Sequence, residues 1–251
     1  MNPTLELLDA RSSTRVYAPT PITDAEKAAV LSATFRAPTG GNMMLYTIID
    51  VADQALKHRL AVTCDDQPFI AKAPWVLVFV ADFQKWIDLF EYSDVASLGA
   101  ECRKPRLGEL MLACSDALIA AQNAVIAAES MGIGSCYIGD ILENAEEHME
   151  LLGLPPHTLP VAMLCFGRPA ATRPRVPRQT AHMVHTDRYQ RLTKADMAEI
   201  SAELEREHAP RGHVPGDANY VQALYRRKYD SEFMAEMNRS VEVWLERWQG
   251  R

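Results

Sequence analysis

Runs of apolar and β-branched residues along the chain predict a small set of buried strands. Residues 75–81 and 159–167 are apolar for long enough to be strands buried on both faces, and 46–51 predicts another strand. Gly132–Ile138 predicts a loop that leads into a further, short strand. Because segments with helical spacing separate these runs, we expect one sheet packed between helices.

Apolar residues at helical spacing predict the remaining elements. The longest such pattern, 107–131, predicts a core helix, because its apolar residues recur every three or four positions. A capping box formed by Thr23 and Glu26 predicts a helix that begins there and ends near Phe35. Shorter helices are predicted over 53–63 and 142–152.

The composition changes after residue 167. Residues 168–178 hold four Arg and three Pro, which predicts an extended basic loop. Beyond it, 194–208 and 220–248 have helical patterns, separated by a break rich in Pro and Gly at 208–216. The sequence therefore predicts an α+β fold with a central mixed or antiparallel sheet and a helical C-terminal extension. We expect residues 1–180 to form the core and 181–251 to form an extension of the same domain.

Charge and cysteine content exclude several classes of function. The formal net charge of −7 argues against binding to DNA or to an anionic membrane, because phosphate contacts need clustered Lys and Arg. Five widely spaced Cys without a C-x-x-C pair predict reduced thiols in the cytoplasm, not a zinc knuckle or a redox dithiol. Met1–Asp9 lacks the pattern of a signal peptide. Polar residues such as Glu109 and Asp116 argue against a membrane span in the long helix.

Two segments carry arginines that could bind an anion. In Arg11–Arg15, two Arg flank hydroxyl residues and could grip a phosphate, since guanidinium forks match phosphate oxygens. Taken alone, these five residues fit a solvated helix end better. The 168–178 segment fits an anion site and a solvated linker equally well. The presence of both segments in an acidic chain favours an anion site.

Two glycine-containing segments have a less specific pattern. Ala37–Asn42 could bring backbone amides and an Asn side chain close to a flat ligand, or could simply be a turn. In Gly132–Gly139, the G-x-G follows a long helix and not a strand, which argues against a Rossmann dinucleotide fingerprint. The sequence has no metal-binding His spacing, no nucleophile elbow and no phosphate-binding P-loop.

Taken together and in order, four segments resemble the nitroreductase-like family of flavoproteins. Arg11–Tyr17 is similar to the family's R-R-S-x-R-x-[FY], and Ala37–Asn42 to its A-P-S-S-G-N loop. Gly132–Gly139 is similar to its G-L-G-x-x-[YW]-I-G turn, and 164–177 to its G-x-P-x…K-P-R-x-P ending. The resemblance covers roughly residues 5–180. The length and the helical tail resemble the branch of larger NADPH-dependent flavin and nitro reductases.

The resemblance implies an FMN site and the residues that would form it. Arg11, Ser12, Ser13 and Arg15, with Arg173 and Arg175, would hold the phosphate and ribityl chain, while Gln67 would contact the ring. Thr39, Gly40 and Asn42 would line the flavin from the neighbouring subunit, and Tyr137, Ile138, Gly139 and Asp140 would run beside the isoalloxazine. Arg211 is a weak candidate for binding the nicotinamide phosphate. No catalytic side chain and no metal is expected, because the flavin N5 carries the chemistry.

The chain departs from the family pattern at several of these positions. Ser12 stands where the family has a second Arg, and Gly40 stands in place of a Ser. Met44–Tyr46 replaces the frequent Gln-Pro-Trp. Asp140 replaces a Gly that many members have; its carboxylate could lie near N5 and disfavour hydride arrival, or could cap a helix from Leu142 onward, which we favour.

The resemblance implies an NAD(P)H-dependent FMN oxidoreductase that works by a ping-pong mechanism. The electron pair would pass to a small acceptor such as a nitroaromatic, a quinone or free flavin. One alternative is a specialised flavoenzyme on the same scaffold: a dehalogenase, an enone reductase or a flavin-consuming benzimidazole synthase. Another is a non-catalytic FMN-binding protein. A cytoplasmic homodimer with FMN sites at the subunit interface is expected, with the apolar residues of 220–248 buried against the partner.

Overall fold

The computed structural model describes residues 2–99, 102–171, 178–208 and 216–250. By their internal contacts, the residues divide into two compact units. The first contains 1–173 and 236–251, and the second contains 174–235. Most of the last helix, from Glu236 onward, therefore groups with the unit that holds the sheet, whereas all of 181–251 was expected to form an extension of the same domain.

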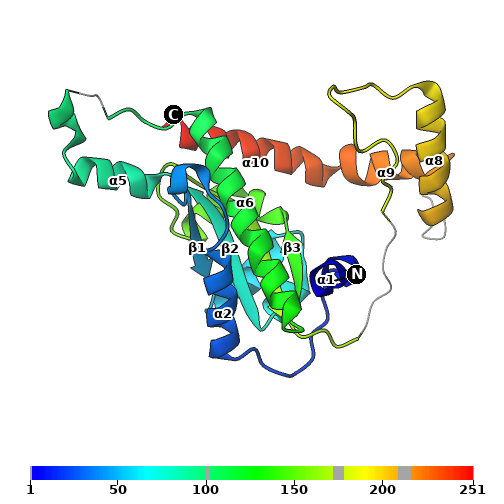
Figure 1. Cartoon of the computed structure of the whole chain (residues 1–251), viewed down its shortest axis with the longest axis horizontal. Coiled ribbons are helices and arrows are strands. Elements are labelled where there is room, and N and C mark those ends of the chain that lie inside the picture. Colours follow the sequence, from blue (N-terminus) through cyan, green and yellow to red (C-terminus); the bar gives the residue numbers. More distant parts are fainter. Residues whose placement is uncertain (1, 100–101, 172–177, 209–215, 251) are drawn as a thin grey trace. The chain divides into compact units, whose positions relative to one another are not determined.

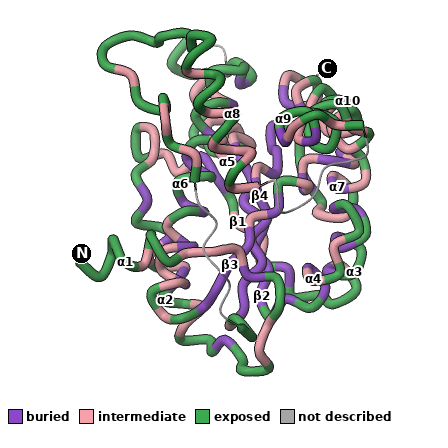
Figure 2. The backbone as a smooth tube through the Cα atoms, turned by 90° about the vertical axis from the view of Figure 1, so that its right-hand side faces the viewer, coloured by how far each residue is buried: buried purple, intermediate pink, exposed green. Residues whose placement is uncertain are grey.

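Four strands form one antiparallel sheet in the first unit (Figure 1). They lie in the order β1-β2-β4-β3, and every neighbouring pair is antiparallel. Figure 2 shows that buried residues concentrate in these strands. All of β2 is buried, as its apolar run predicts. The strands are β1 (Tyr46–Asp50), β2 (Trp75–Asp82), β3 (Gly134–Ile138) and β4 (Thr158–Gly167).

The long helix α6 (Leu107–Ser130) packs against the sheet and against α2 (Asp24–Thr34). Its inner face is rich in alanine, and the small side chains of Ala117, Ala121 and Ala124 are completely buried. By length and composition alone α6 could cross a membrane, but its packing is that of a core helix. The predicted capping box begins α2: Glu26 N–H donates to Thr23 Oγ1 at 3.2 Å, and Thr23 N–H donates to Glu26 Oε2 at 2.8 Å.

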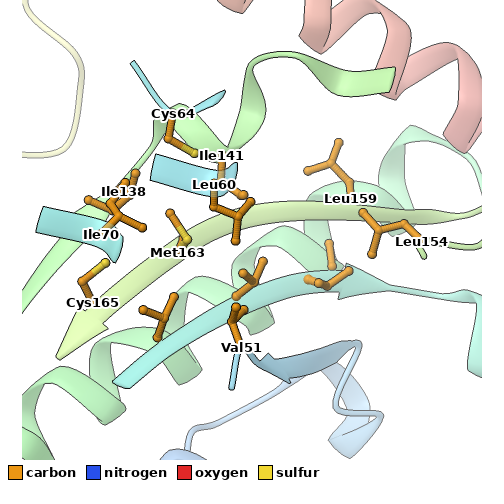
Figure 3. Packing of buried hydrophobic residues seen from close by; sticks show 14 of the residues in the cluster. Val51, Leu60, Cys64, Ile70, Ile138, Ile141, Leu154, Leu159, Met163 and Cys165 are labelled. Carbon is orange, nitrogen blue, oxygen red and sulfur yellow. The ribbon is translucent and has the colours of Figure 1, made fainter. Parts of the chain in front are cut away.

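A second layer of short helices covers the other face of the sheet. Alternate residues of β2 contribute to the two faces, so that Val76 and Val78 pack on this side while Leu77 packs towards α2 and α6. Figure 3 shows Leu60, Ile70 and other residues of this core gathered over β4. The layer consists of α3 (Gln54–Thr63), α4 (Pro68–Ala71), the 3₁₀ turn η3 (Asp140–Leu142) and α7 (Ala145–Leu151).

The helix predicted over 142–152 begins later than expected. Asn144 has a left-handed backbone, with φ of 48°, and separates η3 from α7. The helix α7 starts at Ala145 and has no side-chain cap. The interpretation of Asp140 as a helix cap is therefore wrong, because Asp140 lies in η3, before the left-handed break.

The C-terminal helix α10 (Glu232–Trp248) ends inside the core of its own chain. Trp244 and Trp248 are completely buried. The indole nitrogen of Trp248 donates to the carbonyl of Arg106 at 3.1 Å. His157 Nδ1 and the carbonyl of Trp248 lie 2.6 Å apart. The two tryptophans, four positions apart, lie on the same face of α10. They were expected to be buried against a partner, but this chain alone buries them.

The remaining elements of the first unit are short. The N-terminal α1 (Pro3–Ala10) is capped by Asn2, and η1 (Gly40–Asn42) lies in the loop before β1. Between β2 and α6 lie α5 (Gln84–Tyr92) and η2 (Val95–Leu98), which the apolar pattern did not predict.

The second unit is helical. It contains α8 (Lys194–His208), α9 (Tyr220–Leu224) and a π-helical turn, η5 (Tyr225–Tyr229). The rings of His208 and Tyr220 stack with centroids 4.9 Å apart, and Tyr220 N–H donates to Glu205 Oε2 at 2.7 Å. These contacts join α8 to α9 across the break that the sequence predicts.

Candidate functional site

The N-terminal arginine segment lies directly against β3. The amide of Thr14 donates to the carbonyl of Ser135 at 2.9 Å, and Ser13 forms a parallel bridge with Ser135. This approach requires glycine at position 134, because a Cβ there would lie 2.2 Å from Oγ1 of Thr14. Residues 11–15 are therefore held as an extended strap beside the strand that leads to Tyr137.

The two glycines of the G-x-G pattern have separate structural roles. Gly132 has φ of 71° and follows the last turn of α6, where its amide donates to the carbonyl of Glu129 at 3.0 Å. Gly134 makes room for the strap. The pattern thus ends a helix and admits a crossing segment, which confirms that it is not a dinucleotide fingerprint.

The strap brings positive charge to the end of β3. The guanidinium of Arg15 lies over the ring of Phe69, 5.8 Å from its centroid. Burial raises the pKa of Tyr137 to about 12 against the opposing charge of Arg11, so the phenol is neutral at physiological pH. Its hydroxyl donates to Gln122 Oε1 at 3.3 Å. Arg11 therefore lies near Tyr137, and Arg15 lies over Phe69.

Gln67 lies at the start of α4, two residues before Phe69. A left-handed turn at Asp65 and Asp66, with φ of 60° and 47°, leads into it. The amide nitrogen of its side chain donates to the carbonyl of Cys64 at 2.9 Å. Because this bond fixes the nitrogen, the side-chain oxygen is the atom that Gln67 can offer to a ligand donor.

The turn after β3 is anchored from behind by two buried side chains. Trp244 Nε1 donates to the carbonyl of Leu142 at 2.9 Å. His148 Nδ1 lies 2.9 Å from the carbonyl of Ile141, and its Nε2 lies 2.8 Å from Thr63 Oγ1. Figure 3 shows Ile138 and Ile141 packed into the same core. Gly139 is exposed at the start of this anchored turn.

A buried carboxyl group, Glu143, lies directly behind this turn. The residue is 5% exposed, and its Oε1 has no hydrogen-bond partner among the described residues. Burial raises its pKa to about 7, and the charges of Asp140, Asp65 and Glu236 contribute in the same direction. Glu143 is therefore protonated in a large fraction of molecules at neutral pH.

The loop before β1 is held by side chains from two helices. Asp116 of α6 accepts hydrogen bonds from the amides of Gly40 and Leu45, at 2.9 and 3.1 Å. Trp86 Nε1 donates to the carbonyl of Met43 at 2.9 Å. The ammonium of Lys85 donates to the carbonyls of Met44 and Tyr46. These contacts determine the shape of the loop that contains Thr39, Gly40 and Asn42.

The structure brings only part of the predicted site together. Arg11 lies near Tyr137, while Ser13 and Arg15 interact with the neighbouring Cys136 of β3. Gln67 lies two residues from Phe69, whose ring Arg15 covers. The hydrogen bonds described for the 39–45 loop are internal or go to α5, α6 and the end of β2, and none of them joins the strap. Ser12 lines a cavity of about 540 Å³ with Thr14 and Val16. These three residues alternate along the extended chain with Arg11, Ser13 and Arg15. Arg173, Arg175 and Arg211 lie outside the described residues.

The donor set of the strap suits a phosphate-bearing ligand. Two guanidinium groups and a serine hydroxyl are held on one short segment whose backbone is fixed by β3. Arg168, the first arginine of the basic segment, has a different role. It forms an ion pair with Glu26 and donates to the carbonyl of Met131 at 3.1 Å, which joins the start of α2 to the end of α6.

Comparison with known proteins identifies the family. A model of the nitroreductase family matches residues 8–168. The chain belongs to the nitroreductase family. The oxygen-insensitive NADPH nitroreductase of Salmonella typhimurium is 34% identical over 216 residues, which cover 84% of this chain and 85% of that protein. The NADPH-flavin oxidoreductase of Vibrio harveyi is 30% identical over 212 residues, with the same coverage.

Solved structures of the nitroreductase fold agree along almost the whole chain. The structure of the Vibrio harveyi NADPH:FMN oxidoreductase complexed with NAD⁺ superposes with a TM-score of 0.76 at 26% identity, covering 95% of this chain and 98% of that one. Nitroreductase A from Vibrio parahaemolyticus gives a TM-score of 0.81 at 26% identity, with 98% of each chain covered. The expected α+β nitroreductase fold is confirmed.

Sequence reasoning missed two features of this nitroreductase-family site. Asp116 stood out only as a polar residue in a long helix, and the Thr39–Leu45 loop that it holds lies more than 70 positions away. Glu143 gave no signal, because the buried side of a short helix connection cannot be identified before the chain is folded. A carboxyl on the alanine-rich inner face of a core helix, such as Asp116 in α6, is a signal that could have been used.

Proposed function

We propose that this protein is an FMN-dependent NAD(P)H oxidoreductase that transfers electron pairs to small organic acceptors. The observation that carries the proposal is the strap Arg11–Arg15, fixed on β3 beside Tyr137 and close to Phe69. Bound FMN would supply the two-electron redox chemistry. The names of the relatives, NADPH nitroreductase and NADPH-flavin oxidoreductase, support the same activity.

The strap would hold the phosphate end of the cofactor. Arg11, Ser13 and Arg15 would donate to the phosphate and ribityl oxygens, with Arg173 and Arg175 as further donors. Ser12, on the alternate side of the strap, would contribute less. Fixing the backbone of the strap on β3 means that little conformational entropy is lost when the phosphate binds.

The turn after β3 and the start of α4 would hold the ring. The backbone of Tyr137–Asp140 would run along one edge of the isoalloxazine, and the oxygen of Gln67 would accept from a ring N–H. Positive charge from Arg11 would stabilise the anionic reduced cofactor. The chain's own contribution is thus position and electrostatics, since no side chain of the site has to form a bond with the substrate.

We further propose that the protein is a cytoplasmic homodimer with its FMN sites at the subunit interface. The outer face of α6 supports this proposal, because it exposes large apolar residues along several turns of a helix whose inner face is core. A second copy would cover this face and would bring its own Thr39, Gly40 and Asn42 to the flavin. The exposed residues are Leu107, Met111, Leu112, Leu118 and Ile119.

Asp140 supports one alternative, a specialised flavoenzyme such as a dehalogenase, an enone reductase or a benzimidazole synthase. This half-buried carboxylate follows Gly139 directly and does not cap α7, so it remains available to a substrate or to the ring edge. A charge there would change which acceptors can bind. In this alternative, NADPH reduces the bound flavin but common acceptors are not turned over.

A panel of acceptors tests the proposed function. FMN-loaded protein is mixed with NADPH, or with NADH in a parallel series, and with a nitroaromatic, a quinone or free FMN. Rapid NADPH oxidation with at least one acceptor supports the general oxidoreductase. Bound flavin that is reduced but passes electrons to none of the three supports the specialised enzyme. Bound flavin that neither donor reduces indicates a non-catalytic FMN-binding protein.

A further inference from the structure

The loop Thr39–Leu45 adopts a backbone that its sequence does not favour. Gly41, Asn42 and Met44 have φ of 59°, 58° and 50°, in the left-handed region. Glycine reaches this region freely and asparagine tolerates it, but methionine has no local interaction that compensates for the close approach of its Cβ to the backbone. The rest of the fold must therefore stabilise this shape.

Asp116 holds the loop at both of its ends. One carboxylate oxygen accepts from the amide of Gly40 at 2.9 Å and the other accepts from the amide of Leu45 at 3.1 Å. Asp116 is only 3% exposed, so water cannot easily replace either bond. The two bonds fix the start and the end of the segment that contains the left-handed residues.

Two residues of α5 also hold this part of the chain, and they do so by donating hydrogen bonds to its carbonyl groups. The ammonium of Lys85 donates to the carbonyls of Met44 and Tyr46, and the indole of Trp86 donates to the carbonyl of Met43. Burial lowers the pKa of Lys85, while the charges of Asp82 and Asp116 act in the opposite direction. The buried carboxylate thus holds the loop amides, and a nearby cation holds the loop carbonyls.

We propose that Asp116 is a positioning residue for flavin binding. By fixing the amides of Gly40 and Leu45, it sets the direction in which Thr39, Gly40 and Asn42 face a bound flavin. The proposal rests on the proposed function, because it takes this loop to be part of the flavin site. Both hydrogen bonds described for the Asp116 carboxylate go to the loop, and Asp116 does not have to touch the cofactor.

The substitution Asp116→Asn tests the proposal with almost no change in volume. An amide offers one acceptor oxygen, so one of the two loop amides would face an NH₂ group and lose its bond. In protein without flavin, we expect hydrogen exchange at Gly40 or Leu45 to be at least about tenfold faster. We expect the Kd for FMN to rise by about tenfold or more, because the loop is no longer preorganised.

A variant elsewhere on the same helix provides the control. Asn123 of α6 donates to the carbonyl of Ala33 on α2 at 3.2 Å and does not bond the loop. Asn123→Ala should leave both the exchange of the loop amides and the Kd for FMN unchanged. If Asp116→Asn is insoluble, Asp116→Glu carries the same prediction, since the extra methylene moves both oxygens away from their present positions.

The two readouts separate this proposal from the proposed function. Faster exchange together with weaker FMN binding supports the positioning role. Unchanged exchange in a folded variant, or faster exchange with unchanged FMN affinity, overturns it. If the unsubstituted protein does not bind FMN at all, the proposed function fails, and the role of Asp116 in flavin binding fails with it, whatever the exchange data show.

Discussion

The indole nitrogen of Trp244 donates a hydrogen bond to the carbonyl oxygen of Leu142, 2.9 Å away. This contact joins the last helix of the chain to the turn that follows Tyr137–Asp140, the segment proposed to run beside the flavin. Trp244 is completely buried and packs in the same core as Ile138 and Ile141. The C-terminal helix therefore supports the proposed site from within one subunit.

Two substitutions of Trp244 should destabilise the protein to different extents. Trp244→Ala creates a large cavity and leaves the Leu142 carbonyl without its donor, so the free energy of unfolding should fall by about 3–5 kcal/mol. Trp244→Phe keeps most of the ring and should cost about 1–3 kcal/mol, mainly for the buried carbonyl. Urea unfolding measures both. Tyr92→Ala, at a residue that is 89% exposed, is the control and should change stability by no more than about 0.5 kcal/mol. An equally small effect of Trp244→Ala would contradict the packing described here.

Glu143 should make the stability depend on pH in the range between its two pKa values. Its pKa is about 7 in the folded protein, whereas an unperturbed glutamate, as in the unfolded chain, has a pKa of 4.5. Because the folded pKa is raised, the folded state binds the proton more tightly. The contribution to stability is therefore fully present below the unfolded pKa and is lost as the pH rises through the folded pKa.

The variant Glu143→Gln removes this dependence, because glutamine does not titrate. We expect the variant to gain stability relative to the unsubstituted protein as the pH rises from about 5 to about 8, by roughly 2 kcal/mol. Urea unfolding of both proteins at each pH measures the difference. Glu146→Gln, on the surface of α7, is the matched control and should not gain stability over this range, since Arg239 lowers the pKa of Glu146. A stability difference between Glu143→Gln and the unsubstituted protein that stays constant with pH would show that Glu143 is not a buried, proton-binding group.

Arg15 should contribute to FMN affinity and little to stability. It is exposed, and in the proposed complex its guanidinium donates charge-assisted bonds to the phosphate. Arg15→Ala should weaken FMN binding by about 10- to 100-fold, measured by the quenching of flavin fluorescence. Arg59→Ala, which removes an exposed arginine of α3 that pairs with Glu147, should not change the affinity. Equal FMN affinity in the two variants would rule out the strap as the phosphate site.

The outer face of α6 should control the oligomeric state. Leu118→Glu places a charge in the middle of this apolar face, so the variant should be a monomer when analysed by light scattering after size-exclusion chromatography. It should also lose flavin, because the proposed site includes residues of both subunits. Val62→Glu is the control: Val62 is a similarly exposed apolar residue on α3, and this variant should stay dimeric. A dimeric, flavin-bound Leu118→Glu protein would place the interface elsewhere.

Local signals in the sequence predicted much of the fold. The capping box at Thr23 and Glu26 depends on residues three positions apart, and it begins α2 as expected. The apolar run of β2 needs no partner to be recognised as a buried strand, and all of its residues are buried. One local prediction that was wrong, the start of α7, depends on the left-handed backbone of Asn144, which the apolar pattern does not encode.

The site was predicted less completely, because its parts come from distant segments. The strap Arg11–Arg15 and the turn Tyr137–Asp140 were identified by resemblance, but the contact between Thr14 and Ser135 that brings them together spans more than 100 positions. Asp116 and the 39–45 loop meet only when α6 is packed on the sheet. The burial of Trp244 also depends on tertiary packing. The apolar residues of the C-terminal segment alone do not show whether they are buried within the same chain or against a partner.

The central claim is that the protein binds a flavin that a nicotinamide can reduce. The most direct test is the absorbance spectrum of FMN-reconstituted protein under anaerobic conditions, before and after addition of NADPH and then NADH. We predict that bound flavin gives its usual visible bands and that these bands bleach when at least one of the two donors is added. Protein that does not retain FMN, or whose flavin bands persist with both donors, would contradict the account.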